Sequence, residues 1–165
     1  MPLEVQKHII AAKNLFFGAN YFIILPLPIG WRITRSYLEP DIQSNVQKDN
    51  LTWVDAGQTD QVIFHPIKRV ALDLMIQIKR GKHNGLDTKG VQISSQGSQM
   101  VCGHPASYCI GEVKQGLIKK KTVKTLRFFL YCPELQRTLF LHFTGKCQDA
   151  DLMEIYESVL SLECH

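Results

Sequence analysis

The sequence predicts an α+β fold: a twisted, mainly antiparallel β-sheet flanked by an N-terminal and a C-terminal helix, an α/β/α sandwich. Three patterns carry this prediction. Residues 72–79 alternate apolar and polar side chains, residues 126–131 and 138–143 are two apolar strands around a short turn, and residues 151–162 repeat apolar side chains at helical spacing. Antiparallel hairpins with a helix near each end of the chain pack most economically as a sheet with helices on its faces.

The N-terminal half begins with a predicted amphipathic helix at residues 3–17, because Val5, Ile9, Ala12 and Phe16 recur at helical spacing. The segments predicted after it are a buried strand at 21–25, an extended turn at Pro26 and Pro28, a half-buried strand at 31–37, a loop at 39–50 and a short strand at 61–64. His65-Pro66 ends that last strand.

The C-terminal half has a long stretch rich in Gly, Ser, Lys and Asn at residues 80–99, which predicts a mobile connection with a short helix at 88–94. A strand at 100–113, interrupted at Gly103-His104-Pro105, leads to a basic hairpin tip and the closing hairpin. One face of that hairpin is aliphatic and the other is aromatic, so both faces need cover. Asp149 or Asp151 is the expected N-cap of the final helix.

Length and composition indicate one domain, residues 1–165, with 45% hydrophobic and 21% charged residues. A net charge of +4 permits an acidic partner and falls short of a dedicated nucleic-acid domain. Five cysteines without a disulfide framework indicate reduced thiols in the cytoplasm. Residues 15–31 carry no charge, but glycine and prolines break the run, so we interpret it as strand and turn rather than as a signal or membrane anchor.

Several residues together resemble the PsbP-like fold, shared by the PsbP extrinsic proteins of photosystem II and the Mog-type proteins that bind the Ran GTPase. The residues that carry the resemblance are Pro28, Ile29, Gly30 and Trp31; Phe64 and Pro66; Ala106 and Tyr108; Arg137; and Glu154, Ile155 and Ser158. The patterns Gly103-His104-X-Ala106, Tyr131-Cys132-Pro133 and Cys164-His165 also resemble small uncharacterised archaeal proteins. The resemblance implies an α/β sandwich that serves as a scaffold, assembly factor or binding module.

The cysteines and histidines are the one group of residues in the sequence that suggests metal binding or catalysis. Cys102-Gly103-His104 and Cys164-His165 are two pairs of soft ligands, and zinc takes four such ligands. The metal hypothesis uses His104, Cys132, Cys164 and His165, against the alternative that the cysteines are buried small hydrophobes. Two further alternatives stay open: a disulfide between Cys109 and Cys132, and a thiol nucleophile paired with His104 or His142.

Two other groups of residues suggest binding. His65 and His104 each stand at a predicted strand end, where they serve as turn residues or line a cleft with Trp31 or Trp53 for a small ligand. A basic cluster either protects a sheet edge from aggregation or docks an acidic protein or nucleic acid; it consists of Lys119, Lys120, Lys121, Lys124 and Arg127.

The first interpretation is therefore a non-catalytic binding or assembly module, without a cofactor, that meets a protein partner or small ligand through the basic hairpin or a cleft at the sheet edge. The alternative is a small metal- or thiol-dependent enzyme, in which zinc sits in the Cys/His cluster.

Overall fold

The computed structural model describes the backbone of residues 4–14, 18–34, 51–55 and 58–164, and the side chains of 4–10, 23–33 and 61–164. The larger of its two sheets contains β3 (Arg32–Thr34), β5 (Gln58–His65), β6 (Val70–Arg80), β7 (Gln92–Val101), β8 (His104–Gln115), β9 (Lys121–Cys132) and β10 (Arg137–Gly145). Its strands lie in the order β3-β5-β6-β10-β9-β8-β7, and every neighbouring pair is antiparallel. The smaller sheet, in the order β2-β1-β4, contains β1 (Val5–Asn14), β2 (Gly18–Pro28) and β4 (Leu51–Asp55).

In the part of the chain that the structure describes, the observed class is therefore mostly antiparallel sheet with one short C-terminal helix. The strands predicted at 21–25, 61–64, 72–79, 126–131 and 138–143 are confirmed, within β2, β5, β6, β9 and β10. β3 confirms the middle of the strand predicted at 31–37, whereas residues 35–37 and the loop predicted at 39–50 lie outside the described residues.

The predicted N-terminal helix is wrong, because residues 5–14 form β1. This strand is the middle one of its sheet and pairs antiparallel with β2 and parallel with β4. Its side chains alternate as a strand requires: His8 and Ile10 are buried, and Lys7 and Ile9 are exposed. A segment this short fits the helical repeat and the strand repeat of apolar residues almost equally well. Pairing with β2 on one side and β4 on the other decided in favour of the strand.

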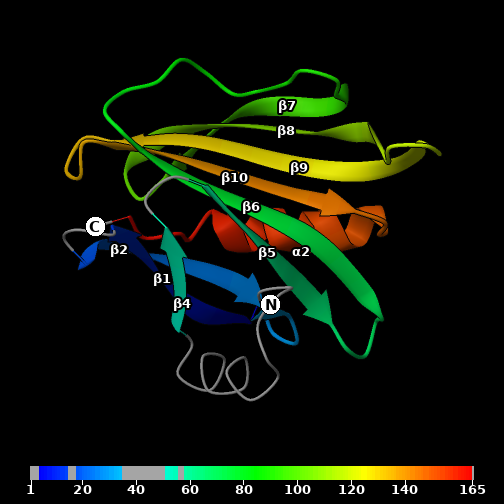
Figure 1. The fold of residues 1–165 in the computed structure, drawn as a ribbon, viewed down its shortest axis with the longest axis horizontal. Coiled ribbons are helices and arrows are strands. Elements are labelled where there is room, and N and C mark those ends of the chain that lie inside the picture. The colour runs from blue at the N-terminus through cyan, green and yellow to red at the C-terminus, as the bar shows by residue number, and fades with distance from the viewer. Residues whose placement is uncertain (1–3, 15–17, 35–50, 56–57, 165) are drawn as a thin grey trace.

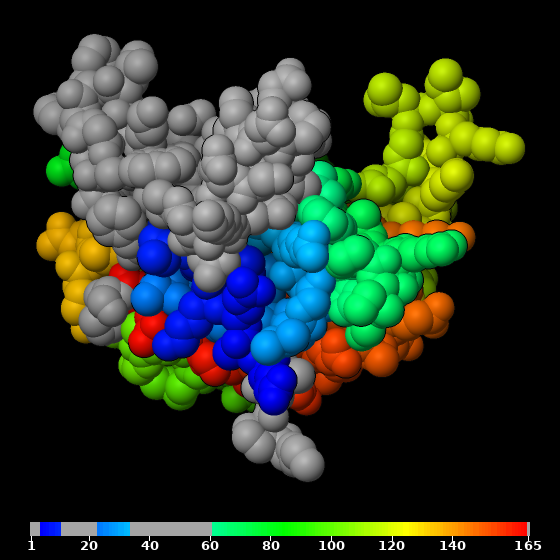
Figure 2. Space-filling view, turned by 90° about the horizontal axis from the view of Figure 1, so that it is seen from below, coloured from blue at the N-terminus to red at the C-terminus, as the bar shows by residue number. Residues whose placement is uncertain are grey.

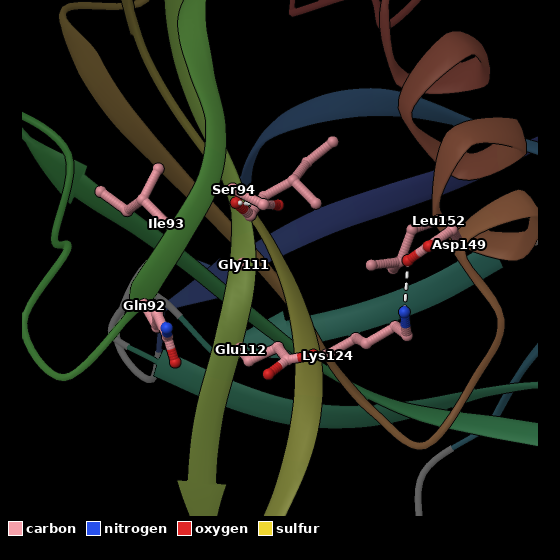
Figure 3. Close-up of a pocket in the computed structure, with 9 residues that line it drawn as sticks. Gln92, Ile93, Ser94, Gly111, Glu112, Lys124, Asp149 and Leu152 are labelled. Atoms are coloured by element: carbon pink, nitrogen blue, oxygen red, sulfur yellow. Dashed lines mark hydrogen bonds and ion pairs between the residues drawn. The ribbon is translucent and has the colours of Figure 1, made fainter.

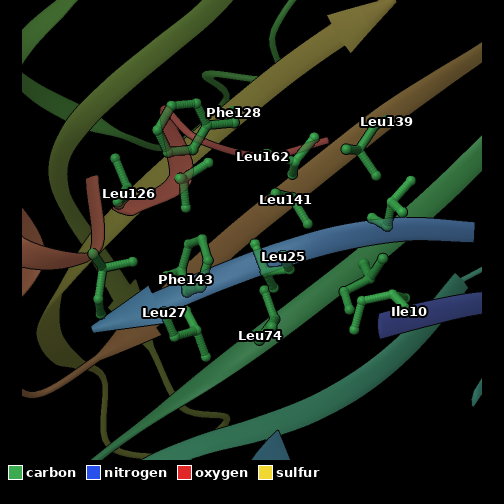
Figure 4. Packing of buried hydrophobic residues seen from close by; sticks show 14 of the residues in the cluster. Ile10, Leu25, Leu27, Leu74, Leu126, Phe128, Leu139, Leu141, Phe143 and Leu162 are labelled. Atoms are coloured by element: carbon green, nitrogen blue, oxygen red, sulfur yellow. The ribbon is translucent and has the colours of Figure 1, made fainter. Parts of the chain in front are cut away.

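The hydrophobic core lies between one face of the larger sheet and a second layer made of β1, β2 and helix α2 (Asp149–Val159) (Figure 1). Figure 4 shows Leu25 and Leu27 of β2 over Leu74, Leu141 and Phe143 of the larger sheet. The β9–β10 register places Leu126 opposite Phe143 and Leu130 opposite Leu139 on this face, as predicted. Burial of these aliphatic rows stabilises the sandwich of the two layers.

The segment after α2 joins this second layer. Ile24 and Glu163 exchange two backbone hydrogen bonds of 2.8 and 3.0 Å, so the C-terminal segment pairs with β2. The predicted cap of α2 is corrected: Gln148 is the N-cap, and its N–H donates to Asp151 Oδ2 at 3.0 Å. Asp151, predicted as a cap itself, supplies the reciprocal half of the capping arrangement from inside the first turn.

The opposite face of the larger sheet is aromatic and partly covered, as its sequence predicts. Residues 81–91 cross it: Arg127 Nη1 donates to the carbonyl oxygen of Asp87 at 2.8 Å, and Lys82 Nζ lies 5.8 Å from the Tyr131 ring centre. The long connection predicted at 80–99 is therefore only partly right, and the helix predicted at 88–94 is absent. Residues 92–101 form the edge strand β7, whose side chains are almost all exposed, so no apolar alternation marks it in the sequence.

Within the described residues, no helix combines the length and apolar character needed to cross a bilayer.

Candidate metal centre

Three segments that are distant in sequence meet at one end of the larger sheet. β7 and β8 are joined by a two-residue turn, Cys102-Gly103, after which His104 begins β8. Ala106 pairs with Leu130, so the same antiparallel register brings His104 beside Cys132, the last residue of β9. Cys164 arrives from the C-terminal segment that pairs with β2. In Figure 1 the C-terminus lies at this end of the molecule.

The potential ligand atoms of His104, Cys132 and Cys164 all lie within 4.8 Å of one another. The Cys164 thiol donates to Cys132 Sγ across 3.0 Å. A tetrahedral zinc ion with bonds of about 2.3 Å to sulfur holds two thiolates about 3.8 Å apart. The two sulfur atoms therefore need to separate by only about 1 Å to take an ion between them.

Glu134 and Cys102 border the three clustered residues. Glu134 Oε2 lies 2.7 Å from His104 Nε2 and 3.6 Å from Cys132 Sγ. On the other side, the backbone N–H of Cys164 donates to Cys102 Sγ at 3.3 Å. A carboxylate that touches a ligating imidazole fixes the orientation and tautomer of the ring, which is a common arrangement around protein metal ions.

Without a metal ion, the surroundings of Cys164 oppose ionisation of its thiol. Burial raises the pKa of the Cys164 thiol, and contact with the Cys132 and Cys102 thiols raises this pKa further. The Cys164 thiol is thus stable in its protonated form. A bound divalent cation reverses this preference, because its charge stabilises the thiolates that coordinate it. The donor set of sulfur and imidazole nitrogen favours zinc over magnesium or calcium, which prefer oxygen.

The structure brings together three of the four residues of the metal hypothesis, and the fourth, His165, lies outside the described residues. Cys102 belongs to one of the two ligand pairs in the sequence but not to the four residues of the metal hypothesis, and the sequence pattern did not identify Glu134. The proximity of Glu134 to Cys132 in the β9–β10 turn was the available signal.

The disulfide alternative is wrong. β8 and β9 are neighbours, as it assumed, but Cys109 faces Arg127, five residues along β9 from Cys132. At about 3.3 Å per residue this offset exceeds the reach of a disulfide. The five cysteines form no disulfide in the described chain.

The thiol-nucleophile alternative finds little support from the pKa values near His142. Cys109 and His142 flank Arg127 in one row of the sheet. Burial raises the pKa of Cys109, and burial, aided by Arg127, lowers the pKa of His142 to about 4. Cys147, with a pKa raised to about 11 chiefly by burial, is no better placed. An activated thiolate needs the opposite shifts.

His65 and His104 do not share a cleft. His65 pairs with Val70 at one end of β6, whereas the Cys132 end of the sheet aligns with Arg80 at the other. The buried His65 ring accepts the Lys68 N–H through Nδ1 at 3.1 Å, as a turn residue does. It also packs edge-on against buried Trp31, with ring centres 5.6 Å apart. Trp53 lies in β4, and its side chain is outside the described part.

The basic hairpin projects from the end of the sheet that lies opposite the Cys/His cluster (Figure 2, yellow-green). Lys119, Lys120 and Lys121 are exposed beside Leu117 and Ile118, whose side chains are completely accessible to solvent. Two other basic residues of this region are engaged within the molecule: Lys124 pairs with Asp149, and Arg127 contacts Asp87.

A groove does lie at the sheet edge, but of the described residues predicted to bind a ligand or partner, only Lys124 lines it. It separates the β7–β8 edge from the first turn of α2 and has a volume of about 320 Å³. Figure 3 shows the Lys124–Asp149 ion pair on its wall, with Ser94 and Glu112 nearby. An adjoining hollow of about 210 Å³ is more apolar, with Tyr108, Leu152 and Tyr156 in its lining.

A scan against known protein families finds no match, and a search of curated proteins finds none either. The candidate site therefore rests on its own geometry.

Proposed function

We propose that this chain is a non-catalytic binding module built around a zinc ion that the Cys/His cluster holds. The convergence of His104, Cys132 and Cys164 within 4.8 Å carries the proposal. Two buried thiols and an imidazole from three distant segments, which meet without a disulfide between the thiols, are the arrangement expected of a structural zinc site.

The burial of the cluster favours a structural ion over a catalytic one. Cys132 and Cys164 are 3% and 1% exposed, and the His104 side chain is 14% exposed. A catalytic zinc ion keeps a position open for water and substrate, which this buried arrangement offers little room for. The metal-dependent enzyme remains the alternative.

The ion would connect segments that belong to different layers of the molecule. The β7–β8 turn and the end of β9 belong to the larger sheet, whereas Cys164 follows Glu163, which pairs with β2 of the smaller sheet. Because such a site forms only in the folded chain, the free energy of metal binding adds to that of folding. Holding the two sheets together is then the main contribution of the ion.

The basic hairpin supports a second role, docking onto an acidic protein partner. Leu117 and Ile118 are the observation that favours it, since two completely exposed aliphatic side chains next to three lysines combine an apolar anchor with positive charge. Binding should weaken with salt and should be lost in both L117S/I118S and K119Q/K120Q/K121Q. Retention of the partner by either variant would contradict a role for the tip.

The relation to the PsbP-like fold and to archaeal proteins that end in Cys-His belongs to this proposal as well, without the α/β/α layering, because the predicted N-terminal helix is strand β1. Its support is the set of matching residues and the C-terminal helix. We further propose a cytoplasmic location, because thiol ligands need a reducing compartment.

Elemental analysis of the purified native protein tests the metal role. We expect one zinc ion per chain, lost in C132S and in C164S and retained in C147S. Cys147 is a matched control, because it is a partly buried thiol outside the cluster. A wild-type protein that binds no zinc, iron or copper, even after zinc is added, would refute the proposal.

A further inference from the structure

We propose that Cys102 is the fourth ligand, which closes the site as a Cys₃His zinc centre, with Glu134 orienting the imidazole of His104. The inference rests on the proposed metal-binding function and specifies its complete ligand set.

The position of the Cys102 sulfur is the first argument. Its Sγ accepts the backbone N–H of Cys164 at 3.3 Å, so it lies directly against a residue of the three-ligand cluster. It also lies two residues before His104, which begins β8 directly after the turn.

The backbone of Cys102 is the second, independent argument. Cys102 and Gly103 have φ values of 54° and 78°, both positive, as the two central residues of a type I′ hairpin turn require. Asn, Asp and Gly adopt the first of these positions most readily, and another residue there costs about 1 kcal/mol or more. A cysteine in this strained position indicates that the side chain, rather than the turn, is what the site needs.

Glu134 is the competing fourth ligand, and its exposure places it outside the centre. Its side chain is 50% exposed, and its Oε2 lies closer to His104 Nε2, at 2.7 Å, than to Cys132 Sγ, at 3.6 Å. This geometry suits a carboxylate that holds the imidazole, an interaction whose loss typically weakens metal binding by about 10–100-fold.

Four protein ligands leave no position for water, so the centre would be structural. Zinc-edge X-ray absorption of the native protein should then show three sulfur ligands at about 2.3 Å and one nitrogen at about 2.0 Å. C102S should retain only two sulfur ligands. E134Q should keep the complete ligand set and bind zinc about 10–100-fold more weakly. H165A should have the same ligand set and the same zinc affinity as the wild type.

A second measurement uses only the wild type and so does not depend on a variant that folds. Alkylation followed by peptide mass spectrometry should find Cys102 protected in the zinc-loaded protein and reactive after chelation. Cys147 serves as the internal reference, since its reactivity should change less. Two sulfurs and an oxygen in the wild-type spectrum, or a Cys102 thiol that reacts equally with and without zinc, would overturn the inference while the proposed metal binding stands. A protein without metal would instead refute the proposed function itself.

Discussion

The two ends of the seven-stranded sheet use similar connections for different purposes. At one end, the β7–β8 turn and the end of β9 gather buried thiols and an imidazole against the C-terminal segment. At the other end, the β8–β9 tip exposes Leu117, Ile118 and three lysines to solvent. The first end is organised by tertiary contacts and should control stability. The second makes few contacts within the molecule and should control association.

Loss of the metal should have the largest effect on stability. We expect C164S to lower the free energy of unfolding by more than about 4 kcal/mol, because the zinc-linked closure of the two sheets is lost. Chelation of the wild type should destabilise it similarly and leave C164S unchanged, as measured by denaturant unfolding. An unfolding midpoint that does not respond to chelation would show that apolar packing alone holds this end.

Acid unfolding should be sensitive to buried His8, a contribution that must be separated from loss of metal. Burial lowers the pKa of His8 from 6.5 to about 4. The unfolded chain therefore binds more protons between these values, so stability is complete above about pH 6.5 and falls as the pH drops toward 4. The loss approaches about 3 kcal/mol.

This dependence is measured on metal-free protein, in which wild type and H8Q are unfolded by denaturant at a series of pH values. H8Q should lose a correspondingly smaller amount of stability on acidification. Equal pH dependence of the two proteins would show that His8 is not buried in a neutral form.

Asp151 should matter more than its neighbour Asp149 at the start of α2. Asp151 is buried, accepts the Gln148 N–H and pairs with Lys68 Nζ at 3.3 Å. We expect D151A to cost about 1–2 kcal/mol, from the lost capping interaction. D149A is the matched control: its side chain is 85% exposed, and its pair with Lys124 should contribute less than about 1 kcal/mol. Thermal unfolding of both variants measures the two losses of stability. Equal losses in D151A and D149A would contradict the capping role of Asp151.

The smallest stability effect should come from the hairpin tip. L117S/I118S should change the free energy of unfolding by less than about 0.5 kcal/mol, because neither side chain is buried. Denaturant unfolding measures this directly. A loss above about 1 kcal/mol would mean that the tip packs against the molecule and is not a free docking surface.

Sequence patterns predicted the strands that have one apolar face. β6 and β9 bury mostly alternate side chains, and β10 buries its aliphatic side chains against the core, so an apolar pattern in the sequence marks all three strands. The prediction failed where pairing, not burial, determines structure. β7 is an exposed edge strand with no apolar face, and β1 became a strand through its neighbours on both sides.

The candidate site was predicted in its composition and not in its arrangement. Residue type alone identified His104, Cys132 and Cys164 as possible ligands. The same reasoning also admitted a Cys109–Cys132 disulfide and a cleft shared by His65 and His104, both of which the strand register separates.

By itself, the sequence determined the apolar strands, the C-terminal helix, the basic tip and the supply of soft ligands, because each depends on residues close together in the chain. Only the tertiary structure decided that His104 lies beside Cys132, that Cys164 returns to them, and that Cys102 stands in a strained turn next to Cys164. These relations depend on the register of antiparallel strands and on the path of the chain after α2. A shift of one residue in that register would turn His104 to the other face of the sheet and abolish the site.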